Sequence, residues 1–164
     1  MTDMELNNEQ GGVPLILVVD DNQQNLELLQ AYLEDIECQT VAAYDGVEAL
    51  KAVSERNPDL ILLDIMMPKM SGFEVCRRLK NDSNTADIPI IIVTALTELG
   101  DIERAIDCGT DDFISKPVNR LELITRVKTM LKLKHLSDKL ERTLAYLSEI
   151  EKQAQLVKSQ KFKE

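Results

Sequence analysis

The segment LILLDIMMPKMSGFEV, which spans Leu60–Val75, gives the clearest indication of the fold. It begins with four aliphatic residues, Leu60–Leu63, and Asp64 follows them directly. A short, continuous apolar run is typical of a strand that is covered on both faces, as in a parallel sheet. Farther along, apolar residues recur at the spacing of one helix face: Phe73, Cys76 and Leu79. The segment therefore predicts a buried strand, an acidic loop and a helix.

The same alternation of strand and helix runs through most of the chain. Four further apolar runs predict strands: Leu15–Val19, Thr40–Ala43, Ile90–Val93 and Phe113–Ile114. Five alternations within about 115 residues predict a parallel sheet with right-handed crossovers, in a three-layer α/β fold. In such a sheet, ligands bind at the carboxyl ends of the strands, where the strand order reverses.

Polar residues follow four of the five expected strands: Asp20-Asp21, Asp64, Thr94 and Lys116-Pro117. Each alone is a weak signal, because such residues also cap helices or mark turns. The predicted sheet, however, brings three carboxylates, a hydroxyl and an ammonium group to one edge. Close carboxylates repel one another by several kcal/mol per pair at an effective dielectric constant of about 20, so the cluster requires a cation. Oxygen ligands of this kind favour Mg²⁺.

This set of groups suits the attack of a carboxylate on a phosphoryl group. An anionic nucleophile approaches an anionic phosphorus centre only where positive charge neutralises the phosphoryl oxygens. Asp64 is then the nucleophile and forms an acyl phosphate, while Asp20 and Asp21 hold Mg²⁺. Thr94 donates a hydrogen bond to one phosphoryl oxygen, and Lys116 pairs with another.

Four segments together resemble the receiver domains of two-component response regulators. They are LILVVDDNQQN at Leu15–Asn25, LILLDIMMPKMSGFEV at Leu60–Val75, IPIIIVTA at Ile88–Ala95 and FISKP at Phe113–Pro117. They occur in the order of the family, and the resemblance covers Leu15 to Leu131. It implies a flavodoxin-like, doubly wound sheet of five parallel strands in the order 2-1-3-4-5, with helices on both faces.

The resemblance also implies a role for each matching residue. Asp64 corresponds to the phosphorylated aspartate, Asp20 and Asp21 to the metal-binding pair, and Lys116 to the family's lysine. Met66 would supply a backbone carbonyl to Mg²⁺. The Lys116–Pro117 peptide bond is expected to be cis. The donor would be a sensor histidine kinase or a phosphotransfer protein, and the domain would be a signalling module that catalyses its own phosphorylation and dephosphorylation rather than an enzyme.

Thr94 and Phe113 match the switch positions of the family. Phosphorylation is expected to draw Thr94 inward and to turn Phe113 into the vacated space, which changes the surface of the fourth helix, fifth strand and fifth helix. Bulky, apolar Met66 and Leu96 lie two residues beyond Asp64 and Thr94. Because neither can orient an attacking water molecule, we expect slow self-dephosphorylation, unless these side chains merely pack at the rim.

The last part of the chain predicts one long helix, since no Gly or Pro occurs from Asn119 onward. Apolar residues recur there every seven residues at two positions: Leu133, Leu140, Leu147 and Ala154 at one, and Leu136, Thr143, Ile150 and Val157 at the other. This seam predicts a homodimeric coiled coil; the alternative is a helix that folds back on its own domain. We expect a disordered leader over residues 1–13, a receiver domain over 14–132 and a helical extension over 133–164.

Composition limits the possible partners and the compartment. No apolar run approaches the roughly 20 residues that span a bilayer, so no membrane segment is expected. The extension carries seven basic and five acidic residues and so has a net charge of +2. Since the whole chain has a net charge of −10, the preceding part has −12, which argues against nucleic-acid binding there. Three scattered cysteines (Cys38, Cys76 and Cys108) indicate reduced thiols in a cytoplasmic protein rather than a metal or redox site.

Two other kinds of function fit the sequence less well. An aspartyl-phosphate-forming hydrolase on a similar fold needs an acid two residues after the nucleophile, where this chain has Met66. A dinucleotide-binding module needs GxGxxG after the first strand, and that motif is missing. The output is open: either a stand-alone regulator, or a receiver whose helix leads into a downstream effector domain, which we favour.

Overall fold

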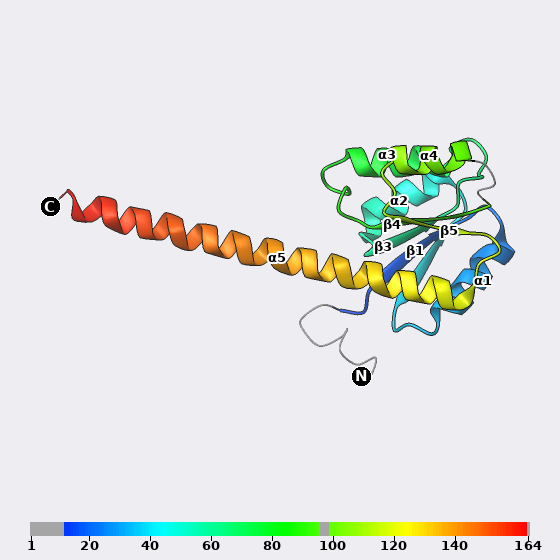
Figure 1. Cartoon of the computed structure of the whole chain (residues 1–164), viewed down its shortest axis with the longest axis horizontal. Coiled ribbons are helices and arrows are strands. Elements are labelled where there is room, and N and C mark those ends of the chain that lie inside the picture. Colours follow the sequence, from blue (N-terminus) through cyan, green and yellow to red (C-terminus); the bar gives the residue numbers. More distant parts are fainter. Residues whose placement is uncertain (1–11, 96–98, 164) are drawn as a thin grey trace.

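The computed structural model describes residues 12–95 and 99–163. Within them, strands and helices alternate (Figure 1): β1 Leu15–Val19, α1 Gln23–Leu33, β2 Gln39–Ala43, α2 Gly46–Arg56, β3 Leu60–Leu63, α3 Gly72–Asn81, β4 Ile90–Thr94, α4 Leu99–Asp107, β5 Asp112–Ser115 and α5 Arg120–Lys161. The predicted strands are confirmed, and their ends differ from the observed ones by no more than one residue. Helix α5 begins at Arg120, one residue after the predicted start at Asn119, which caps the helix.

The strands form one parallel sheet in the order β2-β1-β3-β4-β5, which confirms the predicted flavodoxin-like topology. Helices α2, α3 and α4 cover one face of the sheet, and α1 and α5 cover the other (Figure 1). Alternate residues of each strand point to opposite faces. In β1, Leu17 and Val19 enter the core on the α2–α3–α4 side, whereas Ile16 and Val18 enter the core on the α1–α5 side. Burial on both sides explains why the strands are continuously apolar.

Polar side chains fix where the helices begin. Asn22, Asp45, Ser71 and Asn119 each accept a hydrogen bond from the backbone N–H three residues later, at 3.1, 2.8, 3.3 and 3.0 Å. These caps satisfy N–H groups that have no partner within the helix. Three of these helices, α1, α3 and α5, start immediately after the loops that carry Asp20 and Asp21, Asp64 and Lys116.

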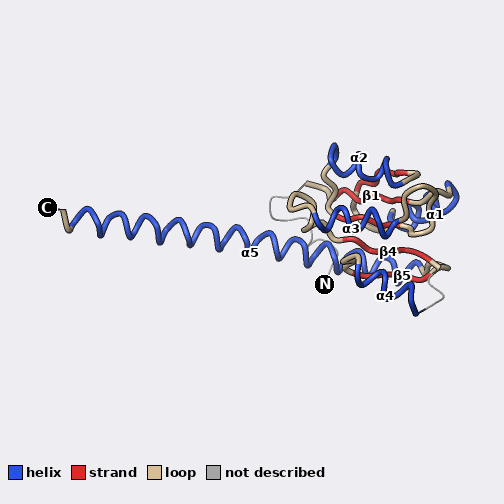
Figure 2. The backbone as a smooth tube through the Cα atoms, turned by 90° about the horizontal axis from the view of Figure 1, so that it is seen from above, coloured by secondary structure: helices blue, strands red, loops and turns tan. Residues whose placement is uncertain are grey.

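Helix α5 has a packed part and a projecting part. Its first turns bury Leu123, Ile124 and Val127 against the sheet. The rest extends away from the domain (Figures 1 and 2). The 42 residues of the helix reach about 63 Å at 1.5 Å per residue. The structure therefore does not adopt the alternative in which the tail folds back. None of the described helices is long and apolar enough to span a membrane.

Candidate functional site

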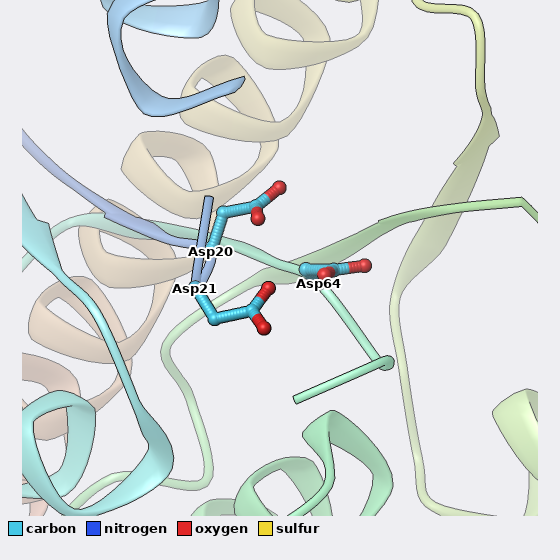
Figure 3. A group of neighbouring side chains, drawn as sticks. All are labelled: Asp20, Asp21 and Asp64. Carbon is cyan, nitrogen blue, oxygen red and sulfur yellow. The ribbon is translucent and has the colours of Figure 1, made fainter. Parts of the chain in front are cut away.

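Three carboxylates meet at the carboxyl edge of the sheet. Asp20 and Asp21 follow β1, and Asp64 follows the neighbouring strand β3. One carboxylate oxygen from each lies within 4.8 Å of the others, and Figure 3 shows the three side chains projecting to the same side of the strand ends. The parallel pairing of β1 with β3 thus produces the crowding that the sequence predicts.

Asp20 is the most enclosed of the three. Its side chain is 1% exposed, and that of Asp64 is nearly as buried, whereas Asp21 lies at the surface. The Asn22 N–H donates to Asp20 Oδ1 at 2.9 Å, and Lys116 Nζ donates to Asp20 Oδ2 at 3.0 Å. These two contacts hold the carboxylate in one orientation beside Asp64.

Lys116 reaches the cluster from the far edge of the sheet. It follows β5, which is separated from β3 by β4, and its Nζ also lies 3.6 Å from Asp64 Oδ1. Three carboxylates and one ammonium group leave two negative charges. A single divalent cation is therefore the species that balances the charge of this pocket. Sequence reasoning assigned Lys116 to a phosphoryl oxygen and did not anticipate its contact with Asp20.

The surroundings of Asp64 oppose its ionised form. Burial is the main cause that raises the pKa of its carboxyl group above the ordinary value, and the charges of Asp20 and Asp21 raise it further. The Lys116 ammonium and a hydrogen bond from the Met66 N–H act in the opposite direction without cancelling the effect. Additional positive charge next to Asp64 would favour the carboxylate, which is the nucleophilic form.

Gly72 lets helix α3 approach the loop that carries Asp64. Its N–H donates to the Ile65 carbonyl at 3.0 Å. A Cβ atom on Gly72 would lie 2.2 Å from the Asp64 carbonyl oxygen and 2.8 Å from the Ile65 Cα. Only glycine fits this position, so α3 braces the backbone of Asp64. Sequence reasoning did not anticipate this contact, because no local pattern reveals a close approach to backbone seven or eight residues away.

The remaining predicted residues lie around the same cleft. Thr94 ends β4 and is buried, and its carbonyl accepts a hydrogen bond from the Lys116 N–H at 3.0 Å. Phe113 is half-buried on β5 and packs against the core on the α2–α3–α4 side. Met66 stands at the rim with 74% of its surface exposed. Leu96 lies outside the described residues. The Lys116–Pro117 peptide bond is cis, as predicted.

The donor set fits a hard divalent cation. The clustered side chains offer only carboxylate oxygens, with no sulfur or imidazole nitrogen among them. Mg²⁺ prefers such ligands, and it is typically held by one or two carboxylates together with water and phosphate oxygens. A cleft beside the cluster is lined by Asp21, Met66 and Thr94, and it continues toward Phe73 and Arg104. A phosphoryl group therefore has a route to Asp64.

Comparison with known proteins agrees with this geometry. The profile of the response regulator receiver domain matches residues 16–128. Response regulator PleD of Caulobacter vibrioides is 42% identical over 125 residues, which are 76% of this chain and 28% of PleD. The DNA-binding dual master transcriptional regulator RpaA of Synechocystis is 38% identical over 73% of this chain and 50% of RpaA. The chain thus spans half or less of the length of these relatives.

Solved structures give the same result. The signal receiver domain of a signal transduction histidine kinase from Syntrophus aciditrophicus is 38% identical, with a TM-score of 0.70 over 73% of this chain and 91% of that domain. A CheY-like response regulator receiver domain protein from Methanospirillum hungatei is 26% identical, with a TM-score of 0.72 over 77% of this chain and 99% of that protein. Fold, sequence profile and relatives agree: the chain belongs to the response regulator receiver family.

Proposed function

We propose that this receiver accepts a phosphoryl group on Asp64 from a sensor histidine kinase or a phosphotransfer protein. The observation that carries the proposal is the cluster of Asp20, Asp21 and Asp64, whose charge Lys116 balances only in part. Asp64 is the natural nucleophile of the three. Ile65, the residue after Asp64, lines the cleft, whereas both oxygens of Asp20 are engaged by Asn22 and Lys116. Asp21 also lines the cleft, and Asp64 is chosen over it because Asp64 matches the phosphorylated aspartate of the receiver family.

Mg²⁺ would be held by the three carboxylates and by the backbone carbonyl of Met66. When bound, it would supply positive charge next to the phosphoryl oxygens. The fit rests on the hard oxygen donors and on the two uncompensated negative charges of the pocket. Asp21 is exposed, so the site can be entered from solvent.

The chemistry belongs to side chains of this chain. The Asp64 carboxylate attacks phosphorus, the bond from phosphorus to the donor breaks, and an acyl phosphate forms. Lys116 pairs with one phosphoryl oxygen, and the Thr94 hydroxyl donates to another. Hydrolysis of the acyl phosphate reverses the modification. Because these groups are all present, the domain catalyses both reactions itself and acts as a signalling module rather than a turnover enzyme.

Phosphorylation then changes the conformation of Thr94 and Phe113. Thr94 moves toward the phosphoryl group, and Phe113, which is half-buried at present, turns into the space that Thr94 vacates. Phe113 lies on β5, between α4 and α5 in the chain. The surface of α4, β5 and α5 changes, and α5 passes the change to the projecting helix.

The projecting helix forms a homodimer in this proposal. Its seam residues are exposed in the single chain, with 59% of Leu140 and 43% of Ile150 accessible to solvent. A lone helix that presents such a stripe is unstable in water, and packing two seams together removes the stripe from solvent. A coiled coil that begins near Leu133 therefore accounts for the heptad pattern.

We divide the chain into a leader over residues 1–13, a receiver over 14–132 and a helical extension over 133–164. Residues 1–11 of the leader lie outside the described residues. The protein works in the cytoplasm and passes its signal to an effector domain or protein that the extension reaches. The acidic receiver does not contact nucleic acid. DNA binding, which the name of RpaA reports, would require a separate domain.

The proposal is tested by incubating the purified chain with acetyl phosphate and following phosphoprotein formation on phosphate-affinity gels. Phosphorylation is expected in Mg²⁺ and not in EDTA. The Asp64→Asn variant should stay unmodified, whereas Asp87→Asn, which removes a surface carboxylate away from the site, should react like the parent chain. Equal labelling of both variants would rule out Asp64. Hydrolysis of a small phosphate ester would favour the alternative function, an aspartyl-phosphate-forming hydrolase. Such a hydrolase needs an acid at the position that Met66 occupies in this chain.

A further inference from the structure

Two of the three cysteines meet inside the domain, although they are 32 residues apart in sequence. Cys76 lies on α3, and Cys108 directly follows α4. The Cys76 thiol donates to the Cys108 carbonyl at 3.3 Å, and the Cys108 thiol donates to the Ala105 carbonyl at 3.0 Å. The two side chains are therefore neighbours, and each affects the pKa of the other. The sequence alone favoured three separate thiols, because nothing in their spacing shows that α3 packs on the end of α4.

The environment makes the two sulfurs chemically different. Both side chains are buried in the core on the α2–α3–α4 side, with 0% and 3% exposed. The Cys76 side chain lowers the pKa of Cys108, whereas the Cys108 side chain and burial raise the pKa of Cys76. One thiol is therefore suited to act as a nucleophile and the other to resolve the product, as in redox-active cysteine pairs.

We propose that Cys76 and Cys108 form an oxidisable dithiol that a peroxide converts to an intramolecular disulfide. The Cys108 thiolate attacks one peroxide oxygen, the O–O bond breaks, and the departing oxygen leaves as water after protonation. Cys108 is then a sulfenic acid. The Cys76 sulfur attacks the Cys108 sulfur, the S–O bond breaks, and a second water molecule leaves. The two thiols together lose two electrons and two protons, which the peroxide takes up.

Burial slows this reaction but does not prevent it. Cys108 lies at the end of α4, and the next residue, Gly109, is exposed and adopts a φ of +87°, as is common where a helix ends. Helix ends open locally far more often than whole domains unfold. A peroxide is little larger than water, so a small opening at this helix end gives it access.

The cross-link would connect two parts of the domain that the proposed function uses. Helix α3 begins at Gly72, next to the Asp64 backbone, and Cys108 leads into β5, which carries Phe113. A disulfide would hold the α4–β5 connection against α3 and restrict the movement of α4. This consequence rests on the proposed function, whereas the formation of the disulfide does not.

The disulfide is tested on the full chain without any phosphoryl donor. The chain is treated with hydrogen peroxide, its free thiols are alkylated, and it is digested without reduction for mass spectrometry. We expect one linked pair of peptides, containing Cys76 and Cys108, that dithiothreitol separates. Cys38 provides the matched control, because it packs against the opposite core and its thiol donates to the Leu33 carbonyl at 3.6 Å. It should be recovered alkylated.

Variants sharpen this result. Cys38→Ser should form the same linked pair, and Cys76→Ser should leave Cys108 as a sulfinic acid, because the resolving thiol is gone. Oxidation of Cys38 alone, or a sulfinic acid at Cys108 in the unmodified chain, would overturn the proposal. If Cys76→Ser does not fold, the peptide map of the unmodified chain decides by itself.

Hydrogen exchange then tests the restraint separately. Amide exchange in α4 is compared between the reduced and oxidised chains, each with beryllium trifluoride and Mg²⁺. Slower exchange in the oxidised chain is expected. Equal exchange in two chains that differ by the mapped disulfide would refute the restraint while leaving the dithiol chemistry established.

Discussion

Replacing Gly72 with alanine should disturb the site without touching any of its polar groups. The new Cβ would lie 2.2 Å from the Asp64 carbonyl oxygen, although such contacts are not shorter than about 3.0 Å in real structures. The backbone of Asp64 or the start of α3 must therefore move by about 0.8 Å. Strain of this kind costs about 1–3 kcal/mol. Since a misplacement of about 1 Å can lower a rate about 100-fold, we expect a loss of that order in phosphorylation by acetyl phosphate.

Gly100→Ala provides the matched control for this variant. Gly100 lies in α4, and among the described residues no atom beyond its chain neighbours and its own helix backbone lies within 4 Å of the position that its Cβ would take. Alanine there should leave both the stability and the phosphorylation rate close to those of the parent chain. Urea denaturation gives both stabilities, and gel time courses give both rates under conditions where each variant is folded. A Gly72→Ala chain with the parent's stability and rate would refute the idea that α3 braces Asp64.

Three further predictions concern the charge of the site, the seam of the projecting helix and the rim of the cleft. Burial raises the pKa of Asp64 above its value in the unfolded chain, so its ionised form opposes folding at neutral pH. This cost falls as the pH drops through the raised pKa and vanishes once the pH is below the ordinary value of 3.8. In EDTA and at neutral pH, Asp64→Asn should therefore unfold at a higher urea concentration than the parent chain. The difference between the two urea midpoints should shrink as the pH is lowered. A lower midpoint for the variant at neutral pH would contradict this. Leu140→Asp should convert the dimer to a monomer, as measured by light scattering. Leu156→Asp changes a similarly exposed leucine outside the seam and should leave the dimer intact. A parent chain that is already monomeric would refute the proposed coiled coil. The phosphorylated parent should persist for many minutes, and Met66→Asn, which can orient water, should shorten its lifetime; loss of label from the parent within seconds would refute a role for Met66.

The sequence predicts most of this fold because a parallel sheet imposes a strict demand. Strands buried on both faces must be apolar throughout, so runs such as Leu60–Leu63 and Ile90–Val93 stand out. The site follows from the same topology, since the ends of parallel strands lie at one edge. That alone places Asp20 near Asp64 before any distance is known.

Three contacts that depend on the detailed packing of side chains and helices were not predictable. The choice of Asp20 as the closest partner of Lys116 depends on how far the lysine reaches across β4 and β3. The fit of Gly72 against the Asp64 carbonyl depends on the angle at which α3 leaves its loop. The meeting of Cys76 with Cys108 depends on the packing of α3 on α4. Each is a property of three-dimensional packing rather than of a local pattern.

The most direct test of the account is chemical trapping of the modified residue. The chain is incubated with acetyl phosphate and Mg²⁺, the acyl phosphate is reduced with borohydride, and the altered residue is identified by mass spectrometry. The account predicts a single modified residue, Asp64, and none when EDTA is present. A modified residue elsewhere, or an unmodified chain in Mg²⁺, would contradict it.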